Sequence, residues 1–214
     1  MHENELRLVS QKTIKMSQQN SVLLLAGSPS ERSRSAALLD SIARKLLARK
    51  GLTIERLNIR DLHAPALLLA DWKHPSIIKA IDQVTRARVV VVATPVYKAA
   101  YSGVLKVFLD LLPQTALKDK TVLPLATGGS PHHMLALDYA LRPVLQALSA
   151  RHILPGVYAT DHQVLQHEDK SYQIGSDIGQ RLDEAVANLL LEGFRIQATP
   201  VFDPVAFSSV RCSV

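Results

Sequence analysis

Apolar residues form short, uninterrupted runs at five places along the chain, and these runs predict five strands. Ser21–Ala26 and Val89–Ala93 consist almost wholly of Val, Leu and Ala, which is typical of strands buried on both faces. Thr121–Ala126 and Ile153–Ala159 are runs of the same kind. Leu52–Ile59 instead alternates with a period of two, as expected of a strand nearer a sheet edge.

Between the strands, apolar residues recur every three or four positions and predict helices. The expected helices cover Ser35–Lys50 (stopped by Gly51), Ser76–Thr85, Ser102–Leu112 (closed by Pro113), Met134–Ala150 and Asp177–Gln197. Alternating strands and helices imply a parallel sheet with helices on both faces. We therefore expect one α/β domain over residues 21–198, with a disordered N-terminal extension, 1–20, and a C-terminal tail, 199–214.

Ligands of such folds bind beyond the carboxyl ends of the strands, near the point where strand order reverses. The loop after the first strand, Gly27–Ser35, has the sequence GSPSERSRS. Its serine hydroxyls, backbone N–H groups and helix N-terminus suit a phosphate, to which Arg34 or Arg32 can add a charged contact. Neither a nucleoside-triphosphate loop nor a dinucleotide Gly-x-Gly-x-x-Gly motif occurs. The alternative is a serine that merely caps the following helix.

Two later loops suit a flat aromatic ligand. Thr94–Gly103 carries two tyrosines among small residues, although it could also be a simple turn with rim tyrosines. Ala126–His133 contains paired glycines, which allow a ring to approach the backbone closely. Its adjacent His132 and His133 lack a nearby cysteine or carboxylate pair, so we expect no metal site. A Gly-x-Ser-x-Gly motif is also absent, which argues against a serine hydrolase.

Composition narrows the class of protein further. The chain is 47% hydrophobic and 21% charged, with a net charge of +6, which suits anionic cofactors. We expect no nucleic-acid partner, because the basic residues are scattered and aromatic residues make up only 5%. No apolar run is long enough to span a membrane. A single cysteine, Cys212, fits a reducing compartment, so we expect a cytoplasmic protein.

Several strings resemble the NAD(P)H-dependent FMN reductase family, and within it the reductases of two-component alkanesulfonate monooxygenase systems. They are LAGSP at 25–29, SRS at 33–35, ATPVYKAAYSG at 93–103, LDLLP at 109–113, VLPLATGG at 122–129 and DYALRPVL at 138–145. The resemblance covers about residues 22–164 and implies a flavodoxin-like, three-layer fold with a five-stranded parallel sheet.

The same resemblance implies where the cofactors bind. The FMN phosphate is expected at Ser28, Ser33, Arg34 and Ser35, and the isoalloxazine along Pro95, Val96, Tyr97, Thr127, Gly128 and Gly129. Tyr139 resembles an inserted tyrosine that makes a π-bulge, and we take it as a catalytic-site residue, although it could be an ordinary half-buried helix aromatic. Glu31 departs from a phosphate-binding pattern and is expected to face solvent.

The implied activity is transfer of a hydride from NADPH to FMN, with reduced flavin passing to a flavin-dependent monooxygenase. A homodimer or homotetramer is implied as well. An FMN-retaining reductase of quinones, azo dyes or metal oxyanions is an alternative, and a flavodoxin-type electron carrier is disfavoured by the positive net charge. Preference for NADPH or NADH stays open, with Lys98, Lys106 and Arg142 as candidate ligands of a 2′-phosphate.

Overall fold

The computed structural model describes residues 20–194. Nearly all of the expected N-terminal extension, the tail 199–214 with Cys212, and the end of the last predicted helix lie outside the described residues. The domain boundaries expected at 21 and 198 therefore stay predictions.

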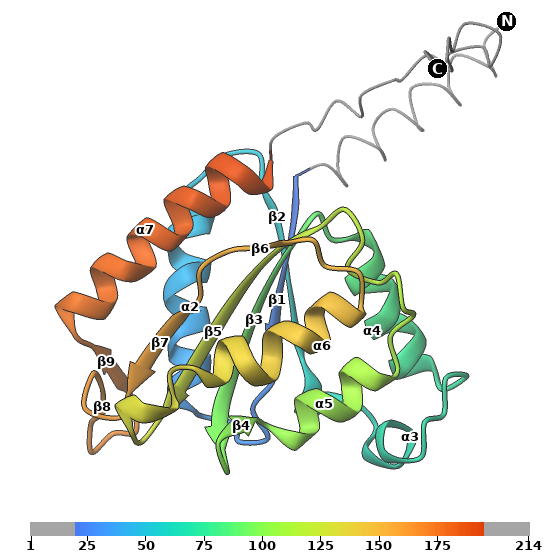
Figure 1. Ribbon diagram of the computed structural model, residues 1–214, viewed down its shortest axis with the longest axis horizontal. Coiled ribbons are helices and arrows are strands. Elements are labelled where there is room, and N and C mark those ends of the chain that lie inside the picture. Colours follow the sequence, from blue (N-terminus) through green and yellow to red (C-terminus); the bar gives the residue numbers. More distant parts are fainter. Residues whose placement is uncertain (1–19, 195–214) are drawn as a thin grey trace, which may run out of the picture.

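A mostly parallel sheet forms the centre of the molecule (Figure 1). Its strands run in the order β2-β1-β3-β5-β6, and β7 pairs with β5 beyond β6. Their bounds are β1 (Ser21–Ala26), β2 (Thr53–Asn58), β3 (Val89–Tyr97), β5 (Thr121–Gly128), β6 (His152–Ile153) and β7 (Val157–Thr160). The expected α/β, flavodoxin-like fold is confirmed. Strand order reverses between β1 and β3, so ligands are expected beyond the carboxyl ends of these two strands.

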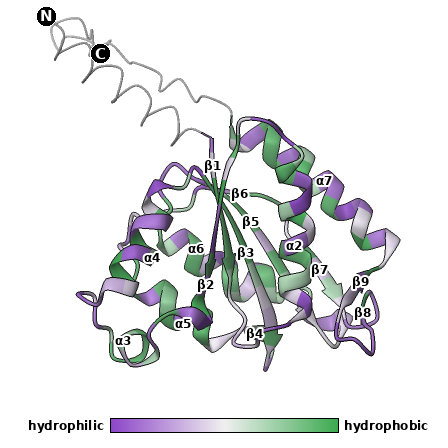
Figure 2. Ribbon diagram, turned by 180° about the vertical axis from the view of Figure 1, so that it is seen from behind, coloured by the Kyte–Doolittle hydropathy of each residue, from purple (hydrophilic) through white to green (hydrophobic). Residues whose placement is uncertain are grey.

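Helices cover both faces of the sheet (Figure 1). One face carries α2 (Arg34–Leu47) and α7 (Ser176–Gly193), and the other carries α4 (Pro75–Arg86), α5 (Gly103–Asp110) and α6 (Arg142–Ala147), with the short α3 (Ala64–Leu68) at its edge. Alternate β1 residues serve the two cores: Val22 and Leu24 pack with α2 and α7, whereas Leu23 and Leu25 pack with the opposite helices. Apolar residues accordingly gather between the sheet and its helices (Figure 2).

The first helix ends earlier than the sequence pattern predicted. α2 stops at Leu47 rather than Lys50, and the N–H of Ala48 bonds back to the Arg44 carbonyl. Gly51, expected directly behind the helix, has φ of 87° in the turn that leads into β2. The glycine provides the left-handed residue of the turn into β2 and does not end the helix, so the prediction that Gly51 stops the helix was wrong.

The fifth predicted strand, Ile153–Ala159, is broken into β6 and β7. Pro155, which has no N–H to donate to a neighbouring strand, lies between them. Gly156 follows at a close approach, since a β-carbon there would lie 3.0 Å from the Pro124 carbonyl oxygen. The polar segment 162–173 has no apolar run and so reads as a loop in the sequence, yet the chain after β7 forms a hairpin of β8 (Val164–Gln166) and β9 (Tyr172–Ile174). Within residues 20–194, no helix combines the length and apolar character needed to cross a membrane.

Candidate functional site

The predicted loop Thr94–Gly103 is largely a hairpin. β3 continues to Tyr97 and pairs with the antiparallel β4 (Ala100–Tyr101), in the register Val96 to Tyr101. The turn consists of Lys98 and Ala99, whose φ values are 49° and 65°. Two consecutive left-handed residues match the twist of the adjoining strands. In sequences such turns are usually recognised by the pairs Asn-Gly or Asp-Gly, and neither pair occurs at this turn. The loop prediction was wrong for this reason.

Ser102 joins the hairpin to the loop behind β1. Its N–H donates to the Thr94 hydroxyl at 3.0 Å, and its own hydroxyl donates to the Gly27 carbonyl. The same hydroxyl accepts from the N–H of Leu105 and so caps α5. One buried serine therefore fixes the first and second ligand-facing segments relative to each other.

Within the first loop, the serine hydroxyls stabilise the loop itself. Ser33 caps α2, accepting from the N–H of Ala36 at 3.1 Å, and its hydroxyl lies 3.2 Å from that of Ser35. Ser28 accepts from the N–H of Ser30 at 3.2 Å. Ser28 and Ser35 are buried, with 4% and 1% of their surface exposed. The helix-cap interpretation thus holds for Ser33, and it is compatible with an anion at the positive end of α2.

A hollow of about 230 Å³ lies beyond the carboxyl ends of β1, β3 and β5. Eight of the expected flavin-binding residues line it: Ser33, Arg34, Pro95, Val96, Tyr97, Thr127, Gly128 and Gly129. The structure thus brings together the three segments selected from the sequence. Ser28 and Ser35 do not line this hollow: Ser28 lines a neighbouring hollow of about 310 Å³ together with Asn58 and Arg60, and Ser35 is buried. Glu31 is exposed and also stays outside it.

Two residues that sequence analysis missed, Asp161 and Tyr172, also line the hollow. Asp161 follows β7 directly, so the rule about carboxyl ends of strands could have found it. Tyr172 belongs to β9 and could not be found without that hairpin. The Nε of Arg34 donates to the Val164 carbonyl at 3.0 Å and lies 3.5 Å from the Asp161 carboxylate. Arg34 thereby links the first loop to the segment after β7.

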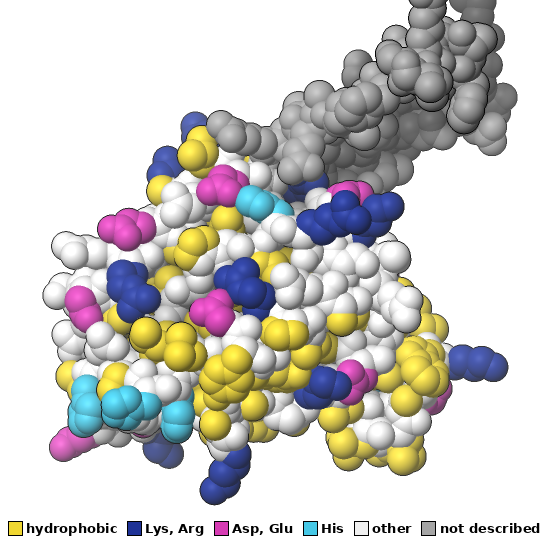
Figure 3. Space-filling view, in the orientation of Figure 1, with side chains coloured by type: hydrophobic (Ala, Val, Ile, Leu, Met, Phe, Trp, Pro, Cys, Tyr) yellow, Lys and Arg dark blue, Asp and Glu magenta, His cyan; other side chains and the backbone are white. Residues whose placement is uncertain are grey.

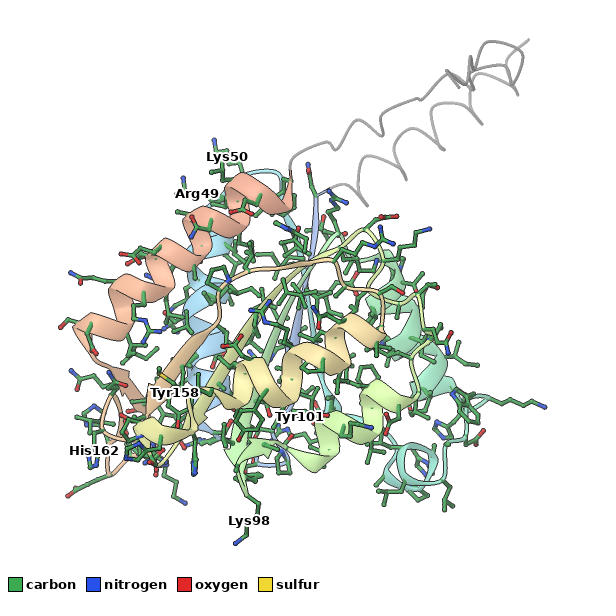
Figure 4. The ribbon with its side chains drawn as sticks, in the orientation of Figure 1. Arg49, Lys50, Lys98, Tyr101, Tyr158 and His162 are labelled. Atoms are coloured by element: carbon green, nitrogen blue, oxygen red, sulfur yellow. The ribbon has the colours of Figure 1, made fainter. Side chains whose placement is uncertain are left out.

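Tyr158, labelled in Figure 4, packs closely against Gly128 in the lining of the hollow. Its hydroxyl donates to the Ser130 carbonyl at 2.6 Å. Burial raises the pKa of Tyr158, and the nearby Asp161 carboxylate raises it further. The phenol therefore remains a neutral donor that holds the turn after β5 in place.

Tyr139 lies in the π-helical turn that the resemblance implied, Leu137–Leu141. The predicted helix Met134–Ala150 is regular only over α6, because this turn and a 3-10 turn at Pro131–His133 precede it. The Tyr139 hydroxyl donates to the carbonyl of Ala99 at the hairpin tip. Tyr139 does not line the hollow, so its connection to the site runs through the hairpin.

Histidines gather at one lower edge of the molecule in the view of Figure 3. In the part of the chain that the structure describes, no group of three or more His, Cys, Asp or Glu side chains is placed to hold a metal ion. His132 and His133 form the 3-10 turn with Pro131 and help to shape the chain after Gly129.

The fold and this hollow define a flavodoxin-like α/β protein whose ligand site lies at the reversal of strand order. A model of the family "NADPH-dependent FMN reductase" matches residues 20–164. The chain is 47% identical over 167 residues to the FMN reductase (NADPH) of Escherichia coli strain K12, covering 77% of this chain and 85% of that protein. It is 44% identical over 186 residues to the FMN reductase (NADPH) of Pseudomonas putida, covering 86% and 91%.

The fold agrees with these relatives. The apo crystal structure of the NADH:FMN oxidoreductase EmoB superimposes with a TM-score of 0.72 at 39% identity, covering 80% of this chain and 89% of that one. The chain belongs to the NADPH-dependent FMN reductase family. The expected enzyme class, an NAD(P)H:FMN oxidoreductase that uses FMN and NADPH, is confirmed. The roles of individual side chains stay predictions.

Proposed function

We propose that the protein reduces FMN with NADPH in the hollow lined by Ser33, Pro95 and Gly128, and supplies the reduced flavin to a partner flavin-dependent monooxygenase. The observation that carries the proposal is the convergence of a helix N-terminus, an arginine and two glycines on one hollow at the strand reversal. The motifs shared with reductases of alkanesulfonate monooxygenase systems support such a partner. Desulfonation of alkanesulfonates for sulfur acquisition is the corresponding pathway.

Binding would use two chemically different ends of the hollow. At one end, Ser33, Arg34 and the first N–H groups of α2 suit the FMN phosphate, since they combine a positive helix end with a guanidinium. At the other end, Pro95–Tyr97 and Thr127–Gly129 offer a flat, narrow surface for the isoalloxazine. Bound FMN would supply the hydride acceptor, and the backbone N–H groups of Thr127–Gly129 would stabilise negative charge that develops on it.

Release of reduced flavin agrees with the openness of this site within one chain. Tyr97, at the edge of the hollow, is 48% exposed, so the described chain encloses little of a bound ring.

We further propose a homodimer or homotetramer, because Met134, Leu135 and Tyr139 lie close together in sequence at the turn beside the site and are each 56% exposed. Figure 3 shows apolar side chains across the face that carries α6 and α5. Light scattering after size exclusion would measure the mass; a monomer at micromolar concentration would contradict an oligomer.

The activity is tested by steady-state oxidation of NADPH with FMN, FAD, riboflavin or a quinone as acceptor. Among the three flavins, we expect the fastest NADPH oxidation with FMN, and many molecules of FMN reduced per protein chain. More NADPH should be oxidised when a partner monooxygenase is present to take up the reduced flavin. Protein that copurifies with bound FMN and turns over a quinone by ping-pong kinetics would support the retained-flavin alternative instead. Absence of NADPH oxidation with every flavin would contradict the proposal.

A further inference from the structure

A second hollow, of about 480 Å³, adjoins the flavin hollow along the outer side of α2. The linings of both hollows include Arg32, Ser33 and Tyr172, so the two adjoin at these residues, and we refer to them together as the trough. From Ser33 to Arg44, α2 rises about 16 Å at about 1.5 Å per residue. The trough therefore extends well past the place proposed for the flavin phosphate, over a length comparable with that of an extended dinucleotide.

The outer part of the trough carries two cations without partners. The side chains of Arg44 and Lys170 line it, and neither forms a hydrogen bond or ion pair with any residue that the structure describes. Arg56, which also lines it, is bound to Asp40 and so is already neutralised. Two carboxylates line it without a described cationic partner: Glu31, and Asp169, which accepts from the N–H of Ser171 at 2.9 Å. Arg32, Arg44 and Lys170 face these two anions, so the charge left in the outer hollow is net positive.

An aromatic ring lies between the two parts of the trough. Tyr172 faces both hollows from β9, and its hydroxyl is held by the Gln166 side chain at 3.3 Å. Every nucleobase has a flat face that stacks on such a ring. A stacking ring beside unpaired cations is the combination that a phosphorylated adenosine requires.

The candidate 2′-phosphate ligands selected from the sequence are less suited to this task. Lys106 is paired with Asp110 at 2.5 Å, and Arg142 with Asp138 at 2.9 Å. Lys98 extends from the hairpin tip into solvent and does not line the trough (Figure 4).

We propose that the outer hollow binds the adenosine end of NADPH, with Arg44 and Lys170 holding the 2′-phosphate and Tyr172 stacking on the adenine. The inference rests on the proposed function and adds the residues that decide between NADPH and NADH. A guanidinium and an ammonium both bind phosphate oxygens strongly, whereas the 2′-hydroxyl of NADH gives them no charge to pair with.

The test compares nucleotides that differ only in the 2′-phosphate. In the Arg44→Ala/Lys170→Ala double variant, we expect kcat/KM for NADPH to fall about tenfold or more, since charge-assisted hydrogen bonds are lost, and kcat/KM for NADH to stay unchanged. Calorimetric binding of 2′,5′-ADP and of 5′-AMP, with FMN saturating, gives a second readout. The unmodified protein should prefer 2′,5′-ADP, and the double variant should lose that preference.

Arg49→Ala/Lys50→Ala is the matched control. It also removes one arginine and one lysine, but just beyond the carboxyl end of α2 and outside the trough (Figure 4). This control should leave kcat/KM unchanged for both NADPH and NADH. If it lowered kcat/KM for NADPH as much as the double variant does, the loss would be explained by net charge alone and the proposal would be overturned. Tyr172→Leu should weaken the binding of NADPH and of NADH equally, because both carry the adenine. Tyr172→Phe keeps the ring and should bind both as the unmodified protein does. A loss of NADPH preference in Lys98→Ala but not in the double variant would also overturn it. Binding of 2′,5′-ADP requires no flavin reduction, so this site can fail or hold independently of the proposed activity.

Discussion

Gly128 and Tyr158 lie on adjoining strands so close together that the tyrosine leaves no space for a side chain at Gly128. A β-carbon on Gly128 would lie 2.5 Å from the Tyr158 hydroxyl oxygen, well inside any permitted contact. The two residues come from β5 and β7, which pair in parallel at this edge of the sheet. The flat floor of the proposed flavin site therefore depends on a missing side chain at one position and an aromatic ring at the other.

Gly128→Ala is expected to lower the free energy of unfolding by about 1–3 kcal/mol, as is typical of an added methyl group without space. The methyl group would displace the Tyr158 hydroxyl from the Ser130 carbonyl and raise the floor into the hollow. Denaturant unfolding and FMN titration would measure both effects. Gly179→Ala is the control, because a β-carbon there meets nothing within 4 Å. Equal stability and equal FMN affinity in both variants would contradict the packing argument.

Tyr158→Phe tests the linkage between the buried phenol and pH. Because the pKa of Tyr158 in the folded protein is raised above 10.0, ionisation favours the unfolded chain. The stability that the phenol contributes is present in full below pH 10.0 and is lost as pH rises above that value. The difference in unfolding free energy between the two proteins should therefore shrink above about pH 10. A difference that stays constant through this range would contradict the raised pKa.

Arg34→Ala separates phosphate binding from ring binding. If the guanidinium contacts the FMN phosphate, its loss should weaken FMN binding about tenfold or more, the range of a charge-assisted hydrogen bond. Riboflavin has no phosphate and should bind almost as before. Quenching of flavin fluorescence measures both affinities. Asp161→Asn also removes the ion pair with Arg34 but keeps the guanidinium, so it should not lower FMN affinity; parallel losses for FMN and riboflavin would assign Arg34 a purely structural role.

Tyr139→Phe removes the hydrogen bond between the π-helical turn and the hairpin tip. We expect the backbone amides of Tyr97–Tyr101 to exchange hydrogen faster, because the hairpin then loses its tie to the turn. Exchange mass spectrometry would detect this change in a single peptide. Exchange in β1, which lies outside the hairpin and pairs with β2 and β3, serves as the internal reference. Unchanged exchange across the hairpin would show that the bond does not restrain it.

The ligand-facing side of the fold was predictable because it depends on local patterns. The apolar run of β1 followed by GSPSERSRS places a strand, a serine-capped helix and a basic residue in order, and each of these follows from neighbours in sequence. The same applies to β3 and to Gly128 and Gly129 at the carboxyl end of β5. Parallel pairing then brings their carboxyl ends to one edge, so eight residues chosen from three segments line one hollow.

Other features arose only from packing between distant segments. Arg34 was expected to be available for a phosphate, yet it is bonded to the Val164 carbonyl and lies near Asp161, about 130 positions away. Tyr172 reaches the site through a polar hairpin whose strands have no apolar run to mark them. The turn at Lys98 and Ala99 has no sequence signature either.

By itself, the sequence determined the order of strands and helices, the parallel sheet and the segments that face the ligand, because hydrophobic periodicity and glycine placement act over a few residues. Only the tertiary structure decided which charges are already neutralised, which cations remain free along α2, and which side chains from β7 and β9 complete the trough. Those contacts depend on distances across the folded molecule, and no pattern within one segment specifies them.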